Sequence, residues 1–187
     1  MSFIGAGHSA FYSDLCRYGQ SPHWCRGPMR DMEGGYIAFL GSSETFGKFI
    51  ERPFVALLEE ASGVPCLNLG CGDMGIDALL ADKILIERAA LADRVVLQVF
   101  SACDLSNPFY QVHPRRNDRF IAPKSDLRAL YPGVDFTQFN FNRHLLRFLK
   151  RRDPERFADI EQVLHQNWQE RMLALLEQLE VPTVLLW

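Results

Sequence analysis

The stretch "YIAFLGSSETFG", residues 36–47, leads from an apolar segment directly into a loop of small and polar residues. Its first five residues have the length and composition of a buried strand. The loop then presents two hydroxyls, on Ser42 and Ser43, and the carboxylate of Glu44 between two glycines. Two interpretations are open: Ser43 is a nucleophile displayed at the end of a strand, or its hydroxyl only supports a turn and the start of a helix.

Strand-like and helix-like patterns alternate along the rest of the chain. Short apolar runs at residues 64–69, 94–100 and 181–187 indicate three more strands, and amphipathic patterns at residues 53–63, 74–93, 137–151 and 154–180 indicate helices. This alternation is typical of parallel strands joined by right-handed crossovers. We therefore predict an α/β fold, a three-layer sandwich of flavodoxin-like type with a mainly parallel sheet.

Local signals predict where the helices begin and end. Pro53 suits the first turn of a helix, and Gly63 is placed to end that helix in the left-handed conformation. The run Asp153-Pro154-Glu155 offers a capping side chain, a first-turn proline and a carboxylate that favours the helix dipole. Residues 101–124, in contrast, are predicted to form one long polar loop.

Length and composition limit the class of protein. The chain has 187 residues, 48% hydrophobic and 23% charged, which fits one globular domain, residues 36–187, behind a loop-rich lead-in, residues 1–35. A net charge of -3 argues against a nucleic-acid partner, and no apolar stretch has the length of a membrane span. Five cysteines without a Cys-x-x-Cys pair argue against a disulfide framework or a zinc site and favour the reducing cytoplasm. We predict no cofactor and no metal.

Polar loops follow three of the predicted strands. Besides the loop with Ser43, these are residues 68–73 and the segment that begins at residues 101–104. Because the carboxyl ends of parallel strands meet at one edge of a sheet, we expect the three loops to converge there. Cys71 and Cys103, one on each of the later loops, are either a thiol pair or metal contact or, as is commoner, small buried side chains.

Two of these loops resemble motifs of the SGNH hydrolases, also called GDSL hydrolases. "FLGSSETFG" resembles the first block of that family, which implies that Ser43 is the nucleophile, with Ser42 in place of the usual Asp. "LNLGCGD", residues 67–73, resembles the second block. That resemblance implies that the backbone N–H of Gly72, or next that of Gly70, helps to form an oxyanion hole.

The third block of the family is matched in part. "VVLQVFSACDL", residues 95–105, carries Asp104 at the position of the family's Asp, whereas Cys103 stands where the family has an oxyanion-hole Asn. Asn107 either reaches in to replace that Asn or only shapes a turn before Pro108.

The catalytic base has no direct counterpart in this sequence. The SGNH family takes its histidine from a C-terminal Asp-x-x-His block, and no such block precedes Trp187. We expect either that the chain is truncated after Trp187 or that His113, on the long polar loop, serves as the base.

Nearly the whole chain also resembles an uncharacterised bacterial family, found largely in alphaproteobacteria, that is distantly similar to the SGNH hydrolases. The resemblance rests on "NPFYQVHPRRNDRF", residues 107–120, on "LYPGVDFTQFNF", residues 130–141, and on the approach to the Ser43 loop. It implies the α/β fold and no particular activity.

A dense polar cluster on the long loop is a second candidate site. It comprises His113, Arg115, Arg116, Asn117, Asp118 and Arg119, next to three aromatic residues. Guanidinium groups suit carboxylate, sulfate or phosphate groups, and aromatic rings can stack on a sugar. The alternative is a buried salt-bridge network that orders the loop, with Asp118 paired to an arginine.

The predicted function is that of an SGNH-like hydrolase or acyltransferase acting on an ester, such as an acylated carbohydrate, with Ser43 as nucleophile. Glu44 either orients the ligand or, as is commoner, only favours the dipole of the helix that begins beside it. The alternative is a non-catalytic domain that holds an anionic or sugar ligand with the strand-end cleft and the arginine-rich loop. The partner in either case is a small molecule or a carbohydrate. A third interpretation is assembly into a homo-oligomer, because an apolar last strand at an open sheet edge invites pairing.

Overall fold

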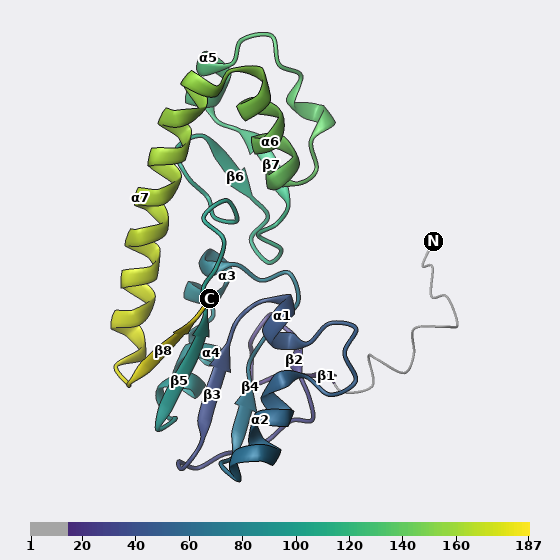
Figure 1. The fold of residues 1–187 in the computed structure, drawn as a ribbon, viewed down its shortest axis with the longest axis vertical. Coiled ribbons are helices and arrows are strands. Elements are labelled where there is room, and N and C mark those ends of the chain that lie inside the picture. Colours follow the sequence, from purple (N-terminus) through teal and green to yellow (C-terminus); the bar gives the residue numbers. More distant parts are fainter. Residues whose placement is uncertain (1–14) are drawn as a thin grey trace, which may run out of the picture. The chain divides into compact units, whose positions relative to one another are not determined.

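The computed structural model describes residues 15–187 (Figure 1). Its contacts divide the described chain into two compact units. Unit one comprises residues 15–72, 82–99 and 179–187, and unit two comprises residues 73–81 and 100–178. The predicted division into a lead-in, with its first part outside the described residues, and one domain stays a prediction.

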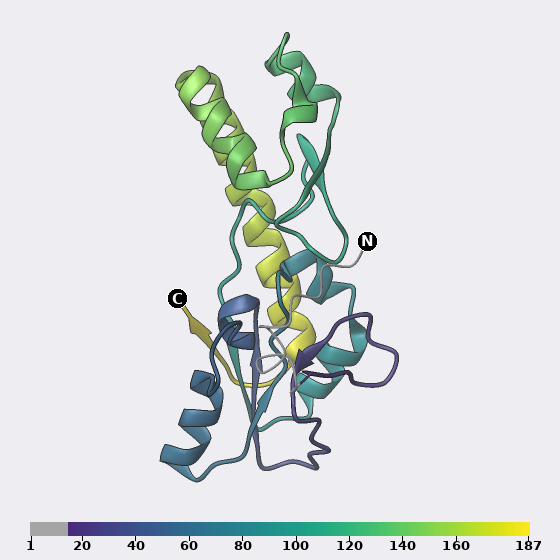
Figure 2. The same ribbon diagram turned by 90° about the vertical axis from the view of Figure 1, so that its right-hand side faces the viewer.

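Unit one is built on a four-stranded parallel sheet. Its strands are β3 (Ile37–Leu40), β4 (Cys66–Asn68), β5 (Arg94–Gln98) and β8 (Thr183–Leu186), in the order β4-β3-β5-β8. All three neighbouring pairs are parallel, as predicted. Figure 2 shows α2 (Phe54–Ser62) on one face of the sheet and α4 (Lys83–Ala90) on the other. The predicted mixed α/β fold with a mainly parallel sheet is therefore confirmed.

The central strand forms because every residue of β3 is apolar. Ala38, Phe39 and Leu40 are buried, and the register places Ala38 between Leu67 of β4 and Val95 of β5. A strand covered on both faces is expected to have such a continuous apolar run. The edge strand β8 differs, because its side chains at residues 184–186 are exposed.

The prediction of one continuous helix over residues 74–93 is wrong. The structure has α3 (Ile76–Leu80), in unit two, and α4, in unit one, with a break between them. The side chain of Asp82 accepts a hydrogen bond from the backbone N–H of Leu85, so it caps a new helix. The apolar pattern continued through the break because both helices bury one face.

Two short elements complete unit one. β1 (Leu15–Cys16) and β2 (Cys25–Arg26) form an antiparallel ribbon, with Cys16 opposite Cys25. α1 (Ser43–Phe46) is a four-residue helix that follows the central strand. The cap predicted for the next helix is confirmed, because Gly63 ends α2 with a φ of 69°.

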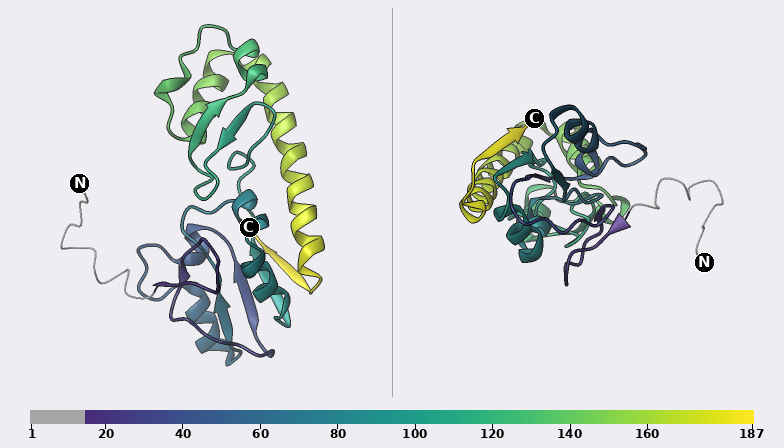
Figure 3. Two further views of the ribbon diagram at one scale, coloured as in Figure 1. Left: turned by 180° about the vertical axis from the view of Figure 1, so that it is seen from behind. Right: turned by 90° about the horizontal axis from the view of Figure 1, so that it is seen from below.

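Unit two contains a hairpin where one long loop was predicted over residues 101–124. β6 (Tyr110–Val112) pairs antiparallel with β7 (Phe120–Pro123). The remaining elements are α5 (Ser125–Leu130), the 3-10 helix η2 (Phe136–Gln138), α6 (Asn142–Arg152) and α7 (Pro154–Leu179). The hairpin residues are buried in one cluster with residues of α6 and α7, and Figure 3 shows these helices beside it.

The long helix follows its predicted pattern. Phe157, Ile160 and Leu164 lie on one buried stripe of α7. Asp153 caps the helix, since its Oδ1 accepts the backbone N–H of Arg156 at 3.1 Å. Among the helices of residues 15–187, none combines the length and the apolar character required to cross a membrane.

Candidate functional site

Ser43 is the first residue of α1, directly beyond the central strand of unit one, and it is half-buried. Ser42, which occupies the N-cap position of this helix, makes no capping hydrogen bond with its side chain. The amide of Gln98 takes that role, because its Oε1 accepts the backbone N–H groups of Ser42 at 2.9 Å and of Thr45 at 3.3 Å. The cap of α1 thus comes from the neighbouring strand β5.

Gln98 holds the loop through further contacts that the sequence reasoning missed. Its Oε1 also accepts the Thr45 hydroxyl at 2.7 Å, and its Nε2 donates to Glu44 Oε2 at 2.8 Å. Gly41 is required here, because a Cβ at that position would lie 2.1 Å from Thr45 Oγ1 and 2.5 Å from Gln98 Oε1. The sequence signal that could have identified this role is Gln98 itself, a single polar residue inside the apolar run of residues 95–100.

Asn68 supports the same loop from the other neighbouring strand. It is the last residue of β4, and its Nδ2 donates to the carbonyl of Thr45 at 2.8 Å while its Oδ1 accepts the N–H of Gly70. In addition, the N–H of Cys71 donates to the carbonyl of Gly41 at 3.0 Å. The loops that follow β3 and β4 therefore meet, and the end of β5 joins them, at the carboxyl edge of the sheet.

The two candidate oxyanion glycines have different surroundings. A Cβ on Gly70 would lie 2.4 Å from the backbone nitrogen of Phe46, so Gly70 lets the loop pack against α1. Gly72 is exposed, and a Cβ there would meet no described atom within 4 Å. Open space therefore lies beside the Cα of Gly72 and not beside that of Gly70.

The other predicted site residues, from Asp104 to Asn117, belong to unit two. His113 Nδ1 accepts the backbone N–H groups of Arg115 and Arg116, both at 3.2 Å. With Nδ1 as an acceptor, the neutral ring carries its proton on Nε2. In this arrangement the imidazole stabilises the turn at the tip of the hairpin.

Asn117 anchors the arginine-rich loop inside unit two. Its side chain is fully buried; Oδ1 accepts the N–H of Ala78 at 3.0 Å and Nδ2 donates to the carbonyl of His113 at 2.8 Å. Arg116 forms an ion pair with Asp73 at 3.0 Å. These contacts correspond to the ordering network that was the alternative interpretation of the cluster.

The acidic partner in this network differs from the predicted one. Among the described residues, Asp118 forms no ion pair with an arginine, and its buried Oδ1 has no hydrogen-bond partner. Burial, together with the nearby charge of Asp73, raises the pKa of Asp118. Arg116 pairs with Asp73 instead, because unit two includes the short segment of residues 73–81.

Asn107 and Asp104 also have structural contacts in unit two. The Oδ1 of Asn107 accepts the backbone N–H groups of Phe109 and Tyr110, at 2.9 and 3.1 Å, which is the turn-shaping arrangement. Asp104 Oδ1 accepts Nδ2 of the buried Asn142 at 3.0 Å.

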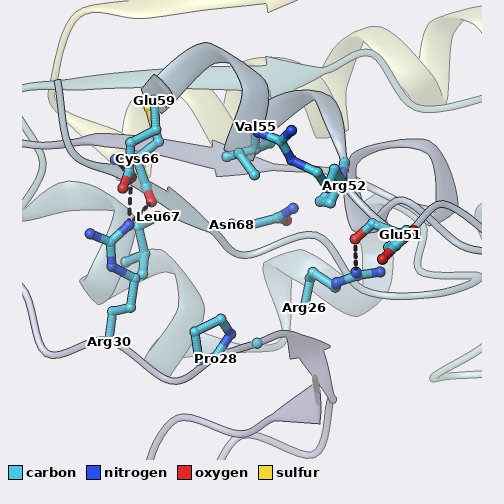
Figure 4. Close-up of a pocket in the computed structure, with 13 residues that line it drawn as sticks. Arg26, Pro28, Arg30, Glu51, Arg52, Val55, Glu59, Cys66, Leu67 and Asn68 are labelled. Atoms are coloured by element: carbon cyan, nitrogen blue, oxygen red, sulfur yellow. Dashed lines mark hydrogen bonds and ion pairs between the residues drawn. The ribbon is translucent and has the colours of Figure 1, made fainter. Parts of the chain in front are cut away.

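A pocket of about 340 Å³ lies in unit one, beside β4 and α2 (Figure 4). Arg26 and Arg30 lie at opposite ends of it (Figure 4), and both guanidinium groups are engaged. Arg26 donates to the carbonyls of Ile50 and Glu51 at 3.0 and 2.7 Å, and Arg30 pairs with Glu59. The hydrogen bond from Arg30 lowers the pKa of Glu59 against the opposing effect of burial. Arg26 thus braces the segment between α1 and α2, whereas Arg30 joins α2 to β4, since it also donates to the carbonyl of Cys66 at 2.9 Å.

Across residues 15–187, no cluster of three or more His, Cys, Asp or Glu side chains is arranged to hold a metal ion. A thiol pair of Cys71 with Cys103 was the less common alternative from the sequence, and Cys71 is buried, as the commoner alternative expected. Its neighbour in unit one is Cys25, with 3.4 Å between the two sulfurs. Cys103 belongs to unit two.

Comparison with known proteins gives a family and no activity. No curated protein and no solved structure matches the chain. One family model matches residues 1–187, and its description is "Domain of unknown function (DUF6473)". Since the match spans the whole sequence, the chain belongs to this family, DUF6473.

Proposed function

We propose that this chain is an SGNH-like hydrolase or acyltransferase that acts on an ester, with Ser43 as the nucleophile. Ser43 Oγ attacks the carbonyl carbon, and the N–H groups of Ser43 and Gly72 stabilise the oxyanion that forms. The substrate is a small ester such as an acylated carbohydrate. Serine acylation and later deacylation by water or a second hydroxyl give hydrolysis or acyl transfer, respectively.

The observation that carries the proposal is the support of Ser43 from two sides. The amides of Gln98 and Asn68, the last residues of the two strands that flank β3, bind the backbone of the loop. Ser43 itself stays half-buried rather than sealed. A nucleophile needs a fixed backbone at a residue that is not fully buried.

The strand order gives a second line of support. Numbered by their order in the chain, the strands of the sheet lie 2-1-3-4, which is how a flavodoxin-like sheet begins. In such sheets ligands bind beyond the carboxyl ends of the strands. Ser43 and Gly72 follow the first two of these strands.

His113, the base predicted from the sequence, belongs to unit two, and its contacts there restrict its tautomer. As a base, the imidazole needs a lone pair on Nε2, which requires the proton on Nδ1. That tautomer gives up the two backbone hydrogen bonds that Nδ1 now accepts. Replacing His113 with Ala therefore separates a base, whose loss lowers the acylation rate, from a turn-forming residue, whose loss lowers only stability.

The direct test is labelling with a fluorophosphonate probe, which reacts with activated serines. The folded chain is expected to be labelled at Ser43, and the Ser43→Ala variant is expected to lose the label. Ser42→Ala is the matched control, because it removes the neighbouring hydroxyl and leaves the loop backbone bound by Gln98. A folded chain that stays unlabelled, or that is labelled at another serine, contradicts the proposal.

Binding of an anion by the arginine-rich loop is the second candidate function. It is favoured by one observation: Arg115 and Arg116 are exposed, at a turn that His113 holds in place. Sulfate or phosphate is then expected to raise the melting temperature, and the double variant Arg115→Ala, Arg116→Ala is expected to lose most of that increase. An unchanged increase in the double variant removes this candidate and leaves the proposal for Ser43 unaffected.

A further inference from the structure

Two buried cysteines that are 46 positions apart in sequence lie side by side in unit one. The sulfurs of Cys25 and Cys71 are 3.4 Å apart. Both side chains are buried, with exposed fractions of 0% and 1%. Cys25 belongs to β2, and Cys71 lies in the loop that follows β4.

The backbone geometry at this pair suits a disulfide. Cys25 and Cys71 are partners in an antiparallel bridge. The N–H of Arg26 donates to the carbonyl of Gly70 at 3.3 Å, which makes the cysteines a pair of the type without mutual hydrogen bonds. In such pairs the Cα atoms are about 4.5 Å apart, and disulfides need roughly 4.4–6.8 Å. The sulfurs can therefore bond by rotating their side chains, without a movement of the backbone.

In the reduced state the two thiols are linked by weak hydrogen bonds. Cys71 Sγ donates to the carbonyl of Leu69 at 3.6 Å, which leaves Cys25 Sγ as the donor to Cys71. The hydrogen bond with Cys71, followed by burial, raises the pKa of Cys25. Since the thiolate is the reactive form, exchange in the folded chain is slow, and the bond forms more readily while the chain folds.

Cys16 is the competing partner. It lies opposite Cys25 in the β1–β2 ribbon, but its Sγ donates to the carbonyl of Arg26 at 3.7 Å. The thiol of Cys66, which is also buried, donates to the carbonyl of Val64. Among the described contacts of these thiols, only Cys25 and Cys71 face one another sulfur to sulfur.

We propose that Cys25 and Cys71 are a redox site, which forms a disulfide by exchange with a small disulfide such as oxidised glutathione. One thiolate attacks the glutathione disulfide and releases one glutathione thiol, and the second cysteine then attacks the mixed disulfide and releases another. Two protein thiols and one oxidised glutathione thus give one protein disulfide and two reduced glutathione molecules. The bond joins the β1–β2 ribbon to the backbone that carries Gly70 and Gly72.

The test is to refold the full chain in buffers with excess oxidised glutathione and to map the linked peptides by mass spectrometry without reduction. We expect one disulfide, between Cys25 and Cys71, with the other three cysteines free or modified singly by glutathione. From the length of the closed loop, oxidation is expected to raise the folding equilibrium constant about 100- to 1,000-fold. The oxidised chain should therefore melt several degrees above the reduced chain.

Two variants separate the competing pairings. Cys16→Ala leaves the proposed pair intact and is expected to give the same disulfide and the same increase in melting temperature. Cys71→Ala is expected to lose both. A map that joins Cys16 to Cys25, or a chain that keeps five thiols unpaired in excess oxidised glutathione, overturns the proposal. Because the map is made on the unmodified sequence, the result does not depend on whether either variant folds.

Discussion

The Ser43 loop of unit one and the arginine-rich loop of unit two are each held by one side-chain amide, but the two amides differ in burial. In each, a side-chain amide binds backbone groups: Gln98 binds the N–H groups of Ser42 and Thr45, and Asn117 binds the N–H of Ala78 and the carbonyl of His113. Gln98 is half-buried and Asn117 is fully buried. The half-buried amide of Gln98 thus positions the Ser43 loop, whereas the buried amide of Asn117 joins segments inside unit two.

The largest expected effect is on the buried amide. Asn117→Ala leaves the N–H of Ala78 and the carbonyl of His113 without partners, so we expect it to lower the free energy of unfolding by about 3 kcal/mol. Denaturation with urea measures this loss. Asn140→Ala, the same change at an exposed position, serves as the control and should cost less than about 0.5 kcal/mol. Equal losses of stability in Asn117→Ala and Asn140→Ala would show that the burial of Asn117 does not account for its contribution.

A smaller expected effect concerns the half-buried amide of Gln98. Gln98→Ala is expected to lower fluorophosphonate labelling of Ser43 about tenfold, because the loop backbone loses its fixed position, which corresponds to about 1.4 kcal/mol. The cost in stability should be smaller than for Asn117→Ala, since water can replace the lost partner.

An exchange of the two side chains sharpens this prediction. In the double variant Glu44→Gln, Gln98→Glu, the hydrogen bond between the two positions is kept with donor and acceptor reversed, and the acceptor for Ser42 and Thr45 remains. Labelling should return toward that of the unmodified chain. If the double variant labels as poorly as Gln98→Ala, then the amide does not act by holding the loop.

Acid is expected to weaken unit one through a buried carboxylate. Burial acts to raise the pKa of Asp82, but hydrogen bonds from His23, Ser21 and the backbone of Leu85 outweigh it and lower the pKa overall. A lowered pKa in the folded state means that the stabilisation is present above the unfolded-state pKa of about 3.9 and is lost as the pH falls below it.

The measurement for Asp82 is the free energy of unfolding between pH 5 and pH 2.5. Asp82→Asn should show a shallower loss of stability across that range than the unmodified chain. Asp159→Asn, at an exposed position on α7, provides the comparison. A slope that is as steep in Asp82→Asn as in the unmodified chain would rule out this carboxylate as a source of the acid sensitivity.

The smallest effect is predicted for the ion pair of the arginine-rich loop. Arg116 and Asp73 are 3.0 Å apart, with 46% of the arginine side chain exposed, so solvent screens the attraction. Arg116→Ala should change the free energy of unfolding by at most about 0.5 kcal/mol. A loss near that of Asn117→Ala would mean that the ion pair, rather than the buried amide, orders the loop.

Sequence reasoning succeeded where the signal was local. The apolar run before Gly41 became the central strand, Gly63 ended a helix as expected, and Asp153 capped the long helix. Each of these signals acts within a few residues of the chain, through conformational preference or burial periodicity. The same local pattern failed at Asp82, because the apolar stripe alone does not reveal that one helix ends and another begins there.

The sequence by itself determined the alternation of strands and helices, and with it the parallel sheet whose strand β3 leads into the Ser43 loop. Tertiary structure alone decided which distant side chains complete that loop and its surroundings. Gln98 lies more than fifty positions from Ser42, and Cys25 lies 46 positions from Cys71. The physical reason is that a hydrogen bond or a sulfur contact depends on the register of packed strands, which no short stretch of sequence encodes.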